Sequence, residues 1–383
     1  MVKLRDICMI NPKAPALVDD LEVSFVPMPK VGEQGEFDPL EIKEYREVKK
    51  GFTNFQNGDV LFAKITPCME NGKGAVARDL KNGYGFGSTE FHVLRPDYNK
   101  VTSEWLYYLT SWNAFRKEAE INMTGSAGQK RVPKTFLENY EVKLPEVEKQ
   151  KEMADTLAHI GNLIALRKEQ LAKLDQLVKS RFIELFGGAD YPTVLFENVC
   201  VFLRNGASIK QTKGAGGYPI TRIETLSNDV FNIDRLGYAD ITDLEKYQSY
   251  VLHNGDILIS HINSVAYLGR AVQYRGQLDT PIIHGMNLLC ARIVDSYNPT
   301  YIEWFFKTPM AKEYISTITK KAVNQASITT SDLKKMQVPN PPKNLQDQFA
   351  AFVEQTDKSK LAIQQSLDKL ELLKKSLMQE YFG

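Results

Sequence analysis

The stretch NGDVLFAKI at residues 57–65 decides the fold, because it recurs as NGDILISHI at residues 254–262, an offset of 197 residues. An offset of 196 residues relates three further pairs downstream: Gln129 and Gln325, Leu137 and Leu333, and Pro145 and Pro341. A nearly constant offset over so long a stretch indicates an internal duplication. Further upstream, Cys8 in DIC matches Cys200 in NVC at an offset of 192, which indicates early loops of different length.

The duplication divides the 383 residues into two variable domains and two better-matched tails. We predict a first variable domain over residues 1–144, a first tail over 145–187, a second variable domain over 188–339 and a second tail over 340–383. A chain of this length and of ordinary globular composition is also too long for one typical domain.

The tails are predicted to be long helices. In the first tail, apolar residues and two arginines recur three or four positions apart: Leu157, Ile160, Ile164, Arg167, Leu171, Leu174, Val178, Arg181 and Leu185. This spacing is typical of a coiled-coil seam. Prolines stand before both predicted helices, at Pro145 and at Pro341 and Pro342, and glycines end the helices, as expected for helix boundaries. The second tail keeps the pattern less regularly, and the stretch 354–362 leaves its packing open.

A helix of ~40 residues is ~60 Å long and cannot bury such a stripe alone. We therefore predict that the second helix folds back antiparallel along the first, giving a dumbbell with approximate two-fold symmetry. Short β-type runs occupy each variable domain: VLFAKI, GAVARDL and STEFHVLRP in the first, and DILISHI, LGRAVQYRG and GMNLLCARI in the second. A short helix should follow in each, over residues 104–119 and 301–315. The predicted fold class is α+β.

Composition excludes several classes of protein. The formal net charge of +1 gives no general basic character, so nucleic-acid binding has to be argued from local patches. Four separated cysteines without a CxxC pair indicate neither a zinc site nor a disulfide framework. The first residues lack the apolar core of a signal peptide, and no stretch reaches the ~18 apolar residues of a membrane span. A soluble, cytoplasmic protein is expected.

None of the candidate catalytic motifs has the residues and the spacing that its chemistry requires. NPPK at 340–343 resembles an amino-methyltransferase loop, but Lys343 replaces the aromatic residue and no donor-binding glycine loop is present. Pro96-Asp97 and Glu141 are too far apart for the usual nuclease pattern. GSAGQKR at 125–131 lacks the spacing of a P-loop, and the five histidines form no metal motif. We predict no catalytic residue, no metal and no cofactor in this chain.

Binding is the remaining prediction, and the polar loops are its candidates. Lysine and arginine reach phosphate or guanine, while asparagine and glutamine can read adenine. The first domain offers Lys64, Thr66, Asn71, Lys73, Ser88, Thr89, Ser126, Gln129, Lys130 and Arg131. The second offers Arg222, Ser260, His261, Asn263, Arg270, His284, Asn287, Asn324, Gln325 and Ser327. The loop around Gln129 or the loop around Gln325 alone could be an ordinary solvated loop. The occurrence of a polar loop at the same place in both halves favours binding.

These features resemble the specificity subunit of Type I restriction-modification systems. The resemblance is carried by NGDVLFAKITPCMENGKGAV with STEFHVLRP, by GSAGQKRVP leading into VKLPEVEKQKEMADTL, and by NGDILISHI, GMNLLCARI and NPPKNLQDQFAAF. It implies two target-recognition domains, each reading one half of a split, asymmetric sequence in double-stranded DNA, joined by two antiparallel helices. It also implies that catalysis belongs to partners: two methyltransferase subunits that bind S-adenosylmethionine and methylate adenine N6, and a restriction and translocase subunit that uses ATP and Mg²⁺.

Two other classes of function stay open at this stage. A stand-alone DNA methyltransferase or nuclease would need catalytic residues that the motifs do not supply. A non-DNA adaptor with duplicated binding heads would show no sequence-dependent DNA protection. The recognised bases do not follow from the sequence, because the correspondence between side chains and bases is degenerate and depends on docking geometry.

Overall fold

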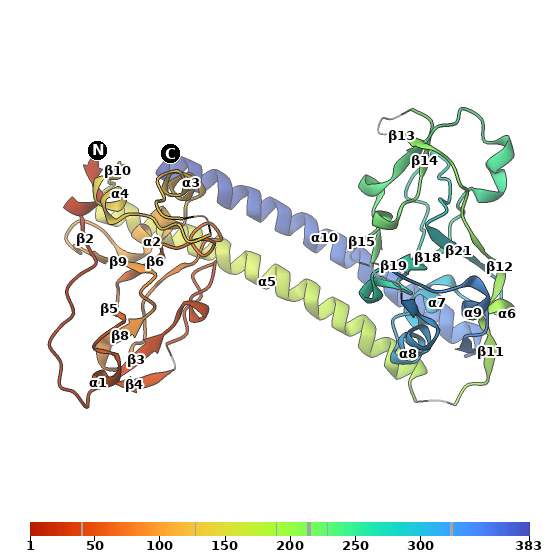
Figure 1. The fold of residues 1–383 in the computed structure, drawn as a ribbon, viewed down its shortest axis with the longest axis horizontal. Coiled ribbons are helices and arrows are strands. Elements are labelled where there is room, and N and C mark those ends of the chain that lie inside the picture. Colours follow the sequence, from red (N-terminus) through yellow and green to blue (C-terminus); the bar gives the residue numbers. More distant parts are fainter. Residues whose placement is uncertain (40, 127, 189, 213–215, 228, 322–324) are drawn as a thin grey trace. The chain divides into compact units, whose positions relative to one another are not determined.

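The computed structural model describes residues 1–383 except 40, 127, 189, 213–215, 228 and 322–324. The chain forms two compact units. Unit 1 comprises Met1–Glu169 and Gln364–Gly383, and unit 2 comprises Gln170–Ile363. Each unit therefore contains one variable domain and one part of each long helix (Figure 1).

A four-stranded antiparallel sheet forms the centre of unit 1. Its order is β2 (Cys8–Ile10), β9 (Phe91–Pro96), β6 (Val60–Ala63) and β7 (Gly74–Val76). Every residue of β6 and β7 is buried, which explains their continuous apolar sequence. A second sheet has the order β4 (Ile42–Glu44), β3 (Glu22–Val26), β8 (Tyr84–Gly87) and β5 (Thr53–Gln56), with β3 and β8 parallel.

Unit 2 repeats the central sheet strand for strand. The order is β12 (Cys200–Asn205), β21 (Leu288–Ile293), β18 (Ile257–Ser260) and β20 (Ala271–Gln273). Val60 pairs with Leu94 in unit 1, and Ile257 pairs with Ala291 in unit 2, so the register is also preserved. The six strands that the apolar runs predicted are thus confirmed.

The remaining sheets of unit 2 differ from those of unit 1. They include the sheet of β13 (Gln211–Thr212), β17 (Gly237–Ala239) and β14 (Tyr218–Ile220), and the pair β15 (Leu226–Ser227) and β16 (Val230–Phe231). Each unit also carries a two-stranded ribbon near its helices, formed by β1 (Val2–Lys3) with β10 (Glu141–Val142) and by β11 (Thr193–Leu195) with β24 (Gln337–Pro339). The duplication thus preserves the central sheet and varies the surrounding strands.

An ion pair closes the NGD turn in both units. The Arg95 guanidinium donates to both oxygens of the buried Asp59 at 2.8 and 2.7 Å. Arg292 and Asp256 form the same bidentate pair at 2.8 Å. Because the two pairs occupy equivalent positions, the recurrence of Asp in NGD has a structural reason, the closure of this turn.

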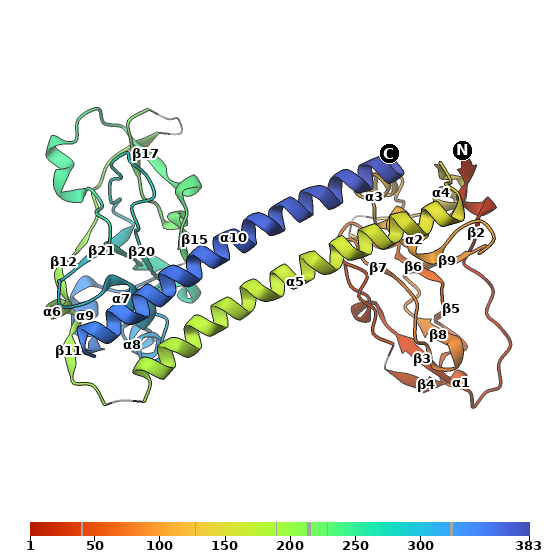
Figure 2. The ribbon, with the colours of Figure 1, turned by 180° about the vertical axis from the view of Figure 1, so that it is seen from behind.

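Helices α5 (Val147–Phe186) and α10 (Lys343–Phe382) are each 40 residues long, which confirms the two predicted helices. Within unit 1 they run antiparallel. Lys168 pairs with Glu371 at 2.9 Å, and Leu157, which precedes Lys168 on α5, shares a core with Met378 and Phe382, which follow Glu371 on α10. Figure 2 shows both helices from behind.

Within unit 2 the two helices are also antiparallel. Lys360 pairs with Asp175 at 2.5 Å, and Phe349 packs against Phe182 and Phe186 with ring centroids 5.2 and 5.7 Å apart. The stretch 354–362, whose packing the sequence left open, fills the seam with Thr356 and Lys360. The Thr356 side chain is 6% exposed, and its hydroxyl donates to the Phe352 carbonyl, which explains how a polar residue is tolerated there.

The prediction of one short helix after each sheet was wrong, because each is two helices. Unit 1 has α2 (Ser103–Ser111) and α3 (Asn113–Ile121), separated by Trp112 in an extended conformation. Unit 2 has α7 (Pro299–Phe305) and α8 (Pro309–Ile318). Pro309 begins a helix under a Thr308 cap, and proline cannot donate the hydrogen bond that would continue the preceding helix.

The other α-helices are short: α1 (Tyr45–Val48), α4 (Lys134–Asn139), α6 (Phe196–Val199) and α9 (Thr330–Lys334). Within the described part of the chain, no helix combines the length and the apolar character that crossing a membrane requires.

Candidate DNA interface

Three segments of unit 1 converge beyond the end of β6. The Val132 amide donates to the Lys64 carbonyl at 2.9 Å, and the Thr66 amide donates to the Lys130 carbonyl at 3.0 Å. The Lys64 amide donates to the Glu90 carbonyl at 2.9 Å, which adds the turn before β9. The structure therefore brings together the loops in which the sequence placed its candidates. We call this set of backbone contacts the loop frame.

Several exposed candidates lie on the hairpin between Thr124 and Arg131, which pair as an isolated bridge. Its tip is closed by the Gln129 amide, which donates to the Ser126 carbonyl at 3.0 Å. Gly125 and Gly128 have φ values of +124° and +80°, a conformation that strains other residues. Three candidates on this hairpin are exposed: Ser126, Gln129 and Lys130.

Arg131 pairs with a carboxylate of its own unit, while 41% of its side chain stays exposed. Its guanidinium donates to both Glu90 oxygens at 2.9 and 2.8 Å, and this charge-assisted contact lowers the pKa of Glu90. Ser88 and Thr89 lie in the turn beside this pair, Thr89 exposed and Ser88 half-buried. The pair holds the base of the hairpin against the turn, so Arg131 positions its neighbours.

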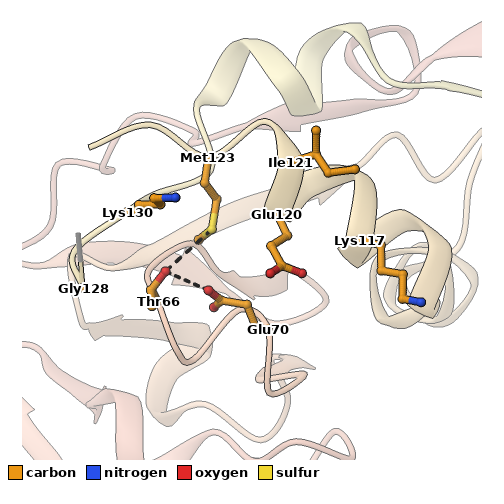
Figure 3. A pocket seen from close by; sticks show the side chains of 8 residues that line it. All are labelled: Thr66, Glu70, Lys117, Glu120, Ile121, Met123, Gly128 and Lys130. Atoms are coloured by element: carbon orange, nitrogen blue, oxygen red, sulfur yellow. Dashed lines mark hydrogen bonds between the residues drawn. The ribbon is translucent and has the colours of Figure 1, made fainter. Parts of the chain in front are cut away.

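A hollow of about 700 Å³ opens beside this hairpin (Figure 3). It is lined by Thr66, Glu70, Lys117, Glu120, Ile121, Met123, Gly128 and Lys130. The Thr66 hydroxyl donates to Glu70 Oε1 at 2.8 Å and lies 3.7 Å from Met123 Sδ. The wall thus carries carboxylates and ammonium groups together. Asn71, the candidate that follows Glu70, is exposed.

Unit 2 repeats the loop frame with different polar residues. The short strands β19 (Ile262–Asn263), β23 (Ala326–Ser327) and β22 (Lys320–Lys321) form a sheet in that order. The Ile328 amide donates to the His261 carbonyl at 2.9 Å, the equivalent of the bond from Val132 to Lys64. The same backbone therefore presents one set of side chains in unit 1 and another in unit 2.

The candidates on this second frame differ in exposure. Ser260 is buried and accepts a hydrogen bond from the Asn263 amide group at 3.3 Å, and Ser327 is half-buried. Gln325 is exposed, like its counterpart Gln129. Asn324 lies outside the described residues.

Three of the candidate lysine and arginine side chains donate hydrogen bonds to groups of their own unit. The Lys73 ammonium donates to the Met28 and Val31 carbonyls at 3.2 and 3.1 Å. Arg270, at the equivalent position, donates to the Leu226 carbonyl at 3.0 Å and pairs with Asp229. Arg222 donates to the Gln211 side chain at 2.5 Å. These contacts hold the three side chains against their own units, and direct DNA contact by these side chains stays a prediction.

The two histidine candidates of unit 2 are buried. Burial lowers the pKa of His261 and lowers that of His284 to about 4. His284 is 2% exposed, with Nε2 at 2.8 Å from the Leu288 carbonyl, so this ring is neutral and fixed. Asn287 beside it is half-buried. Whether these residues contact DNA stays a prediction.

Sequence reasoning missed several residues that build the site. Glu70 and Glu90 were overlooked because carboxylates were considered only as metal ligands. Gln150 and Gln346 were also overlooked, although the 196-residue offset relates them. Within the described ranges, no group of three or more histidine, cysteine, aspartate or glutamate side chains is arranged to hold a metal.

Both glutamines are fully buried and fasten a long helix to its domain. Gln150 accepts from the Thr102 amide at 2.9 Å and donates to the Lys100 and Pro145 carbonyls at 2.8 Å. Gln346 accepts from the Asn298 amide and donates to the Pro341 carbonyl, both at 2.8 Å. Comparison of the two halves residue by residue would have found this pair.

This chain, whose two loop frames carry different side chains, matches a known protein family. The family model described as "Type I restriction modification DNA specificity domain" matches residues 1–176 and 192–373. The chain belongs to this family. Both copies of the specificity domain include one loop frame and most of one long helix.

Relatives of this specificity family match parts of the chain. The Type I restriction enzyme EcoAI specificity subunit of Escherichia coli is 42% identical over 184 residues, which is 46% of this chain and 31% of that protein. The EcoEI specificity subunit, also from Escherichia coli, is 40% identical over 47% of this chain and 31% of its own length. The matched parts thus span about a third of these curated relatives.

The fold is shared over the whole chain. The solved Type I restriction-modification S subunit from M. genitalium superimposes with a TM-score of 0.59, at 13% identity, covering 100% of this chain and 95% of that one. The agreement shows that the two specificity-family chains share a fold.

Proposed function

We propose that this chain is the DNA-recognition subunit of a Type I restriction-modification complex. Each unit reads one half of a bipartite, asymmetric sequence in double-stranded DNA. Partner subunits then carry out adenine N6 methylation or restriction at the site so selected. The observation that carries this proposal is the repeated loop frame, which presents Ser126, Gln129 and Lys130 in unit 1 and a different polar set in unit 2.

Base-edge recognition needs exposed donors and acceptors on a rigid backbone, and differences between copies change the bases that are read. The two loop frames supply such exposed groups, since Gln129 and Gln325 are exposed. The formal net charge of +1 supplies little general attraction to phosphate. Tight binding should accordingly depend on partner subunits that enclose the DNA.

The chain is proposed to be non-catalytic and cytoplasmic. Two methyltransferase subunits would bind S-adenosylmethionine, and a restriction and translocase subunit would use ATP and Mg²⁺. The long helices are the proposed scaffold for these partners, because they carry exposed leucines that no unit covers, among them Leu166 and Leu372.

The test combines a partner requirement with a domain exchange. The chain is incubated with DNA and labelled S-adenosylmethionine, alone and with the methyltransferase subunits of its system, and methyl transfer is expected only with the partners. Residues 190–338 are then replaced by the matching domain of a relative, and methylome sequencing should show one half of the recognition sequence changed and the other kept.

Each alternative gives a different result in these experiments. Methylation by the isolated chain would indicate a stand-alone methyltransferase. Absence of sequence-dependent DNA protection in the assembled complex would indicate an adaptor that does not read DNA. Alteration of both halves after the exchange would contradict independent reading by the two units.

A further inference from the structure

The hollow beside the unit 1 hairpin contains a carboxylate with unused acceptor capacity. Glu70 Oε1 accepts from the Thr66 hydroxyl at 2.8 Å, and the buried Oε2 has no hydrogen-bond partner among the described residues. An ionised carboxylate offers about four acceptor positions, so Thr66 orients the group and leaves most of them open. The partner that Glu70 lacks is therefore a hydrogen-bond donor.

The other residues that line the hollow indicate what kind of molecule carries that donor. Lys117 and Lys130 line the same hollow as Glu70, and Ile121 and Met123 lie between the two lysines in the view of Figure 3. A site with both signs of charge suits a ligand that carries an amino group together with anionic groups. A base in a DNA strand meets this description, because its exocyclic amine can face Glu70 while the flanking phosphates face the lysines.

Two exocyclic amines are presented in the major groove, N6 of adenine and N4 of cytosine. Adenine places the N7 acceptor directly beside N6, and its lone pair would repel a carboxylate. Cytosine has no acceptor at that place, and glutamate accepts from its N4 group. We propose that Glu70 reads a cytosine in the half-site bound by unit 1, an inference that rests on the proposed function.

The Oε2 atom is buried in this conformation, so a base in the hollow can reach it only after the Glu70 side chain changes rotamer. Rotation about the terminal torsion alone would only place each oxygen where the other was. Rotation about the torsions nearer the backbone moves the whole carboxylate. The contact thus needs a side-chain movement but no movement of the loop frame.

The second unit lacks this carboxylate. Tyr267 occupies the position equivalent to Glu70 at the 197-residue offset. Tyr267 is 47% exposed, and the Arg270 guanidinium lies 4.7 Å from its ring centroid. An aromatic side chain cannot accept from a base amine as a carboxylate does, so the cytosine contact belongs to unit 1 alone.

The test replaces the Glu70 carboxylate by an amide of nearly the same shape. The chain is co-expressed with the methyltransferase subunits of its system, and methylome sequencing defines both half-sites, with the unit 1 half identified by the domain exchange. Glu70→Gln keeps an oxygen for Thr66 but adds an amide donor, which suits adenine N6 and N7. A wild-type preference for cytosine over adenine of about 5- to 150-fold should be lost or reversed at one position.

Matched variants separate this reading from a general effect of charge or folding. Glu120→Gln removes a carboxylate from the same hollow, and Tyr267→Phe alters the equivalent position of unit 2; both should keep the cytosine preference in the unit 1 half-site. Thermal unfolding should show that Glu70→Gln folds like the wild type. If it does and the unit 1 half-site is unchanged, the inference is wrong while the proposed function stands. If the wild type shows no bipartite methylation, both fail together.

Discussion

A single buried glutamine fastens each long helix to its domain, and its loss should be measurable. Gln150→Met keeps the volume but leaves the Thr102 amide and the Lys100 and Pro145 carbonyls without their partner. Each buried group left unpaired costs about 1–3 kcal/mol, so the free energy of unfolding should fall by at least that amount.

Urea denaturation checks this expectation. Gln176→Met is the matched control, because Gln176 is exposed on the same helix. Equal midpoints for the two variants would contradict the role assigned to Gln150. The residue could not have been found by apolar periodicity, because a buried glutamine looks like one more polar position of an amphipathic helix. Its function depends on Thr102, which lies 48 residues away.

Buried histidines should make stability depend on pH. Burial lowers the pKa of His92 from 6.5 to about 4, and its Nε2 and Nδ1 lie 2.8 and 3.0 Å from the Val132 carbonyl and the Asn11 amide. Above pH 6.5 the ring is neutral in both states, so this residue contributes no pH dependence. As pH falls from 6.5 towards 4, the unfolded chain binds a proton that the folded chain does not, and stability decreases.

The expected loss between pH 7.5 and 5.5 is about 1 kcal/mol for this histidine. Urea denaturation of the wild type and of His92→Gln at both pH values measures it, with His159→Gln as a control because His159 is exposed on α5. The His92 variant should show the smaller pH dependence. An equal pH dependence in all three proteins would show that the ring is not held neutral.

At the scale of an element, the hairpin between Thr124 and Arg131 separates two kinds of DNA contact. If Gln129 touches a base, Gln129→Ala should weaken cognate binding by about 1–3 kcal/mol and leave nonspecific binding unchanged. Lys130→Ala should instead weaken binding to all sequences and reduce the salt slope by about 1, because lysine contacts phosphate. Gln325→Ala should act like Gln129→Ala on the other half-site.

Competition binding of the assembled complex at several salt concentrations measures these effects. Lys143→Ala is the control for charge, because Lys143 is exposed in unit 1 outside the hairpin. If all four variants bind like the wild type, the contact surface lies elsewhere in the units.

Elements with a strong local pattern in the sequence could be predicted, and features without such a pattern could not. The 3-4 spacing from Leu157 to Leu185 predicted α5, because a seam buried along one stripe imposes that period on the sequence. The break at Trp112 was missed, since its flanking helices continue one apolar pattern and the extended conformation arises from tertiary packing. The pairing of Arg131 with Glu90 could not be predicted, because the two residues lie 41 positions apart in the sequence. A local pattern thus located the loops, and only the fold showed which of their donors are free.

At the scale of the whole molecule, the long helices should set the spacing between half-sites. The boundary between the units falls between Glu169 and Gln170 on α5 and between Ile363 and Gln364 on α10. An insertion at both points leaves each unit's own helix contacts intact, including the Lys168–Glu371 pair of unit 1 and the Asp175–Lys360 pair of unit 2. Only the length of helix that joins the units changes.

Four residues inserted at both points add ~6 Å of helix, near the rise of two base pairs, and slightly exceed one turn of 3.6 residues, so the seam nearly keeps its face. Methylome sequencing should find unchanged half-sites separated by a longer spacer. Two residues at both points should instead rotate the two parts of each helix by about 200° relative to each other and abolish methylation, because the helices can no longer keep the contacts of both units at once. A four-residue variant that kept the original spacer at full activity would show that these helices do not set the distance between the recognised bases.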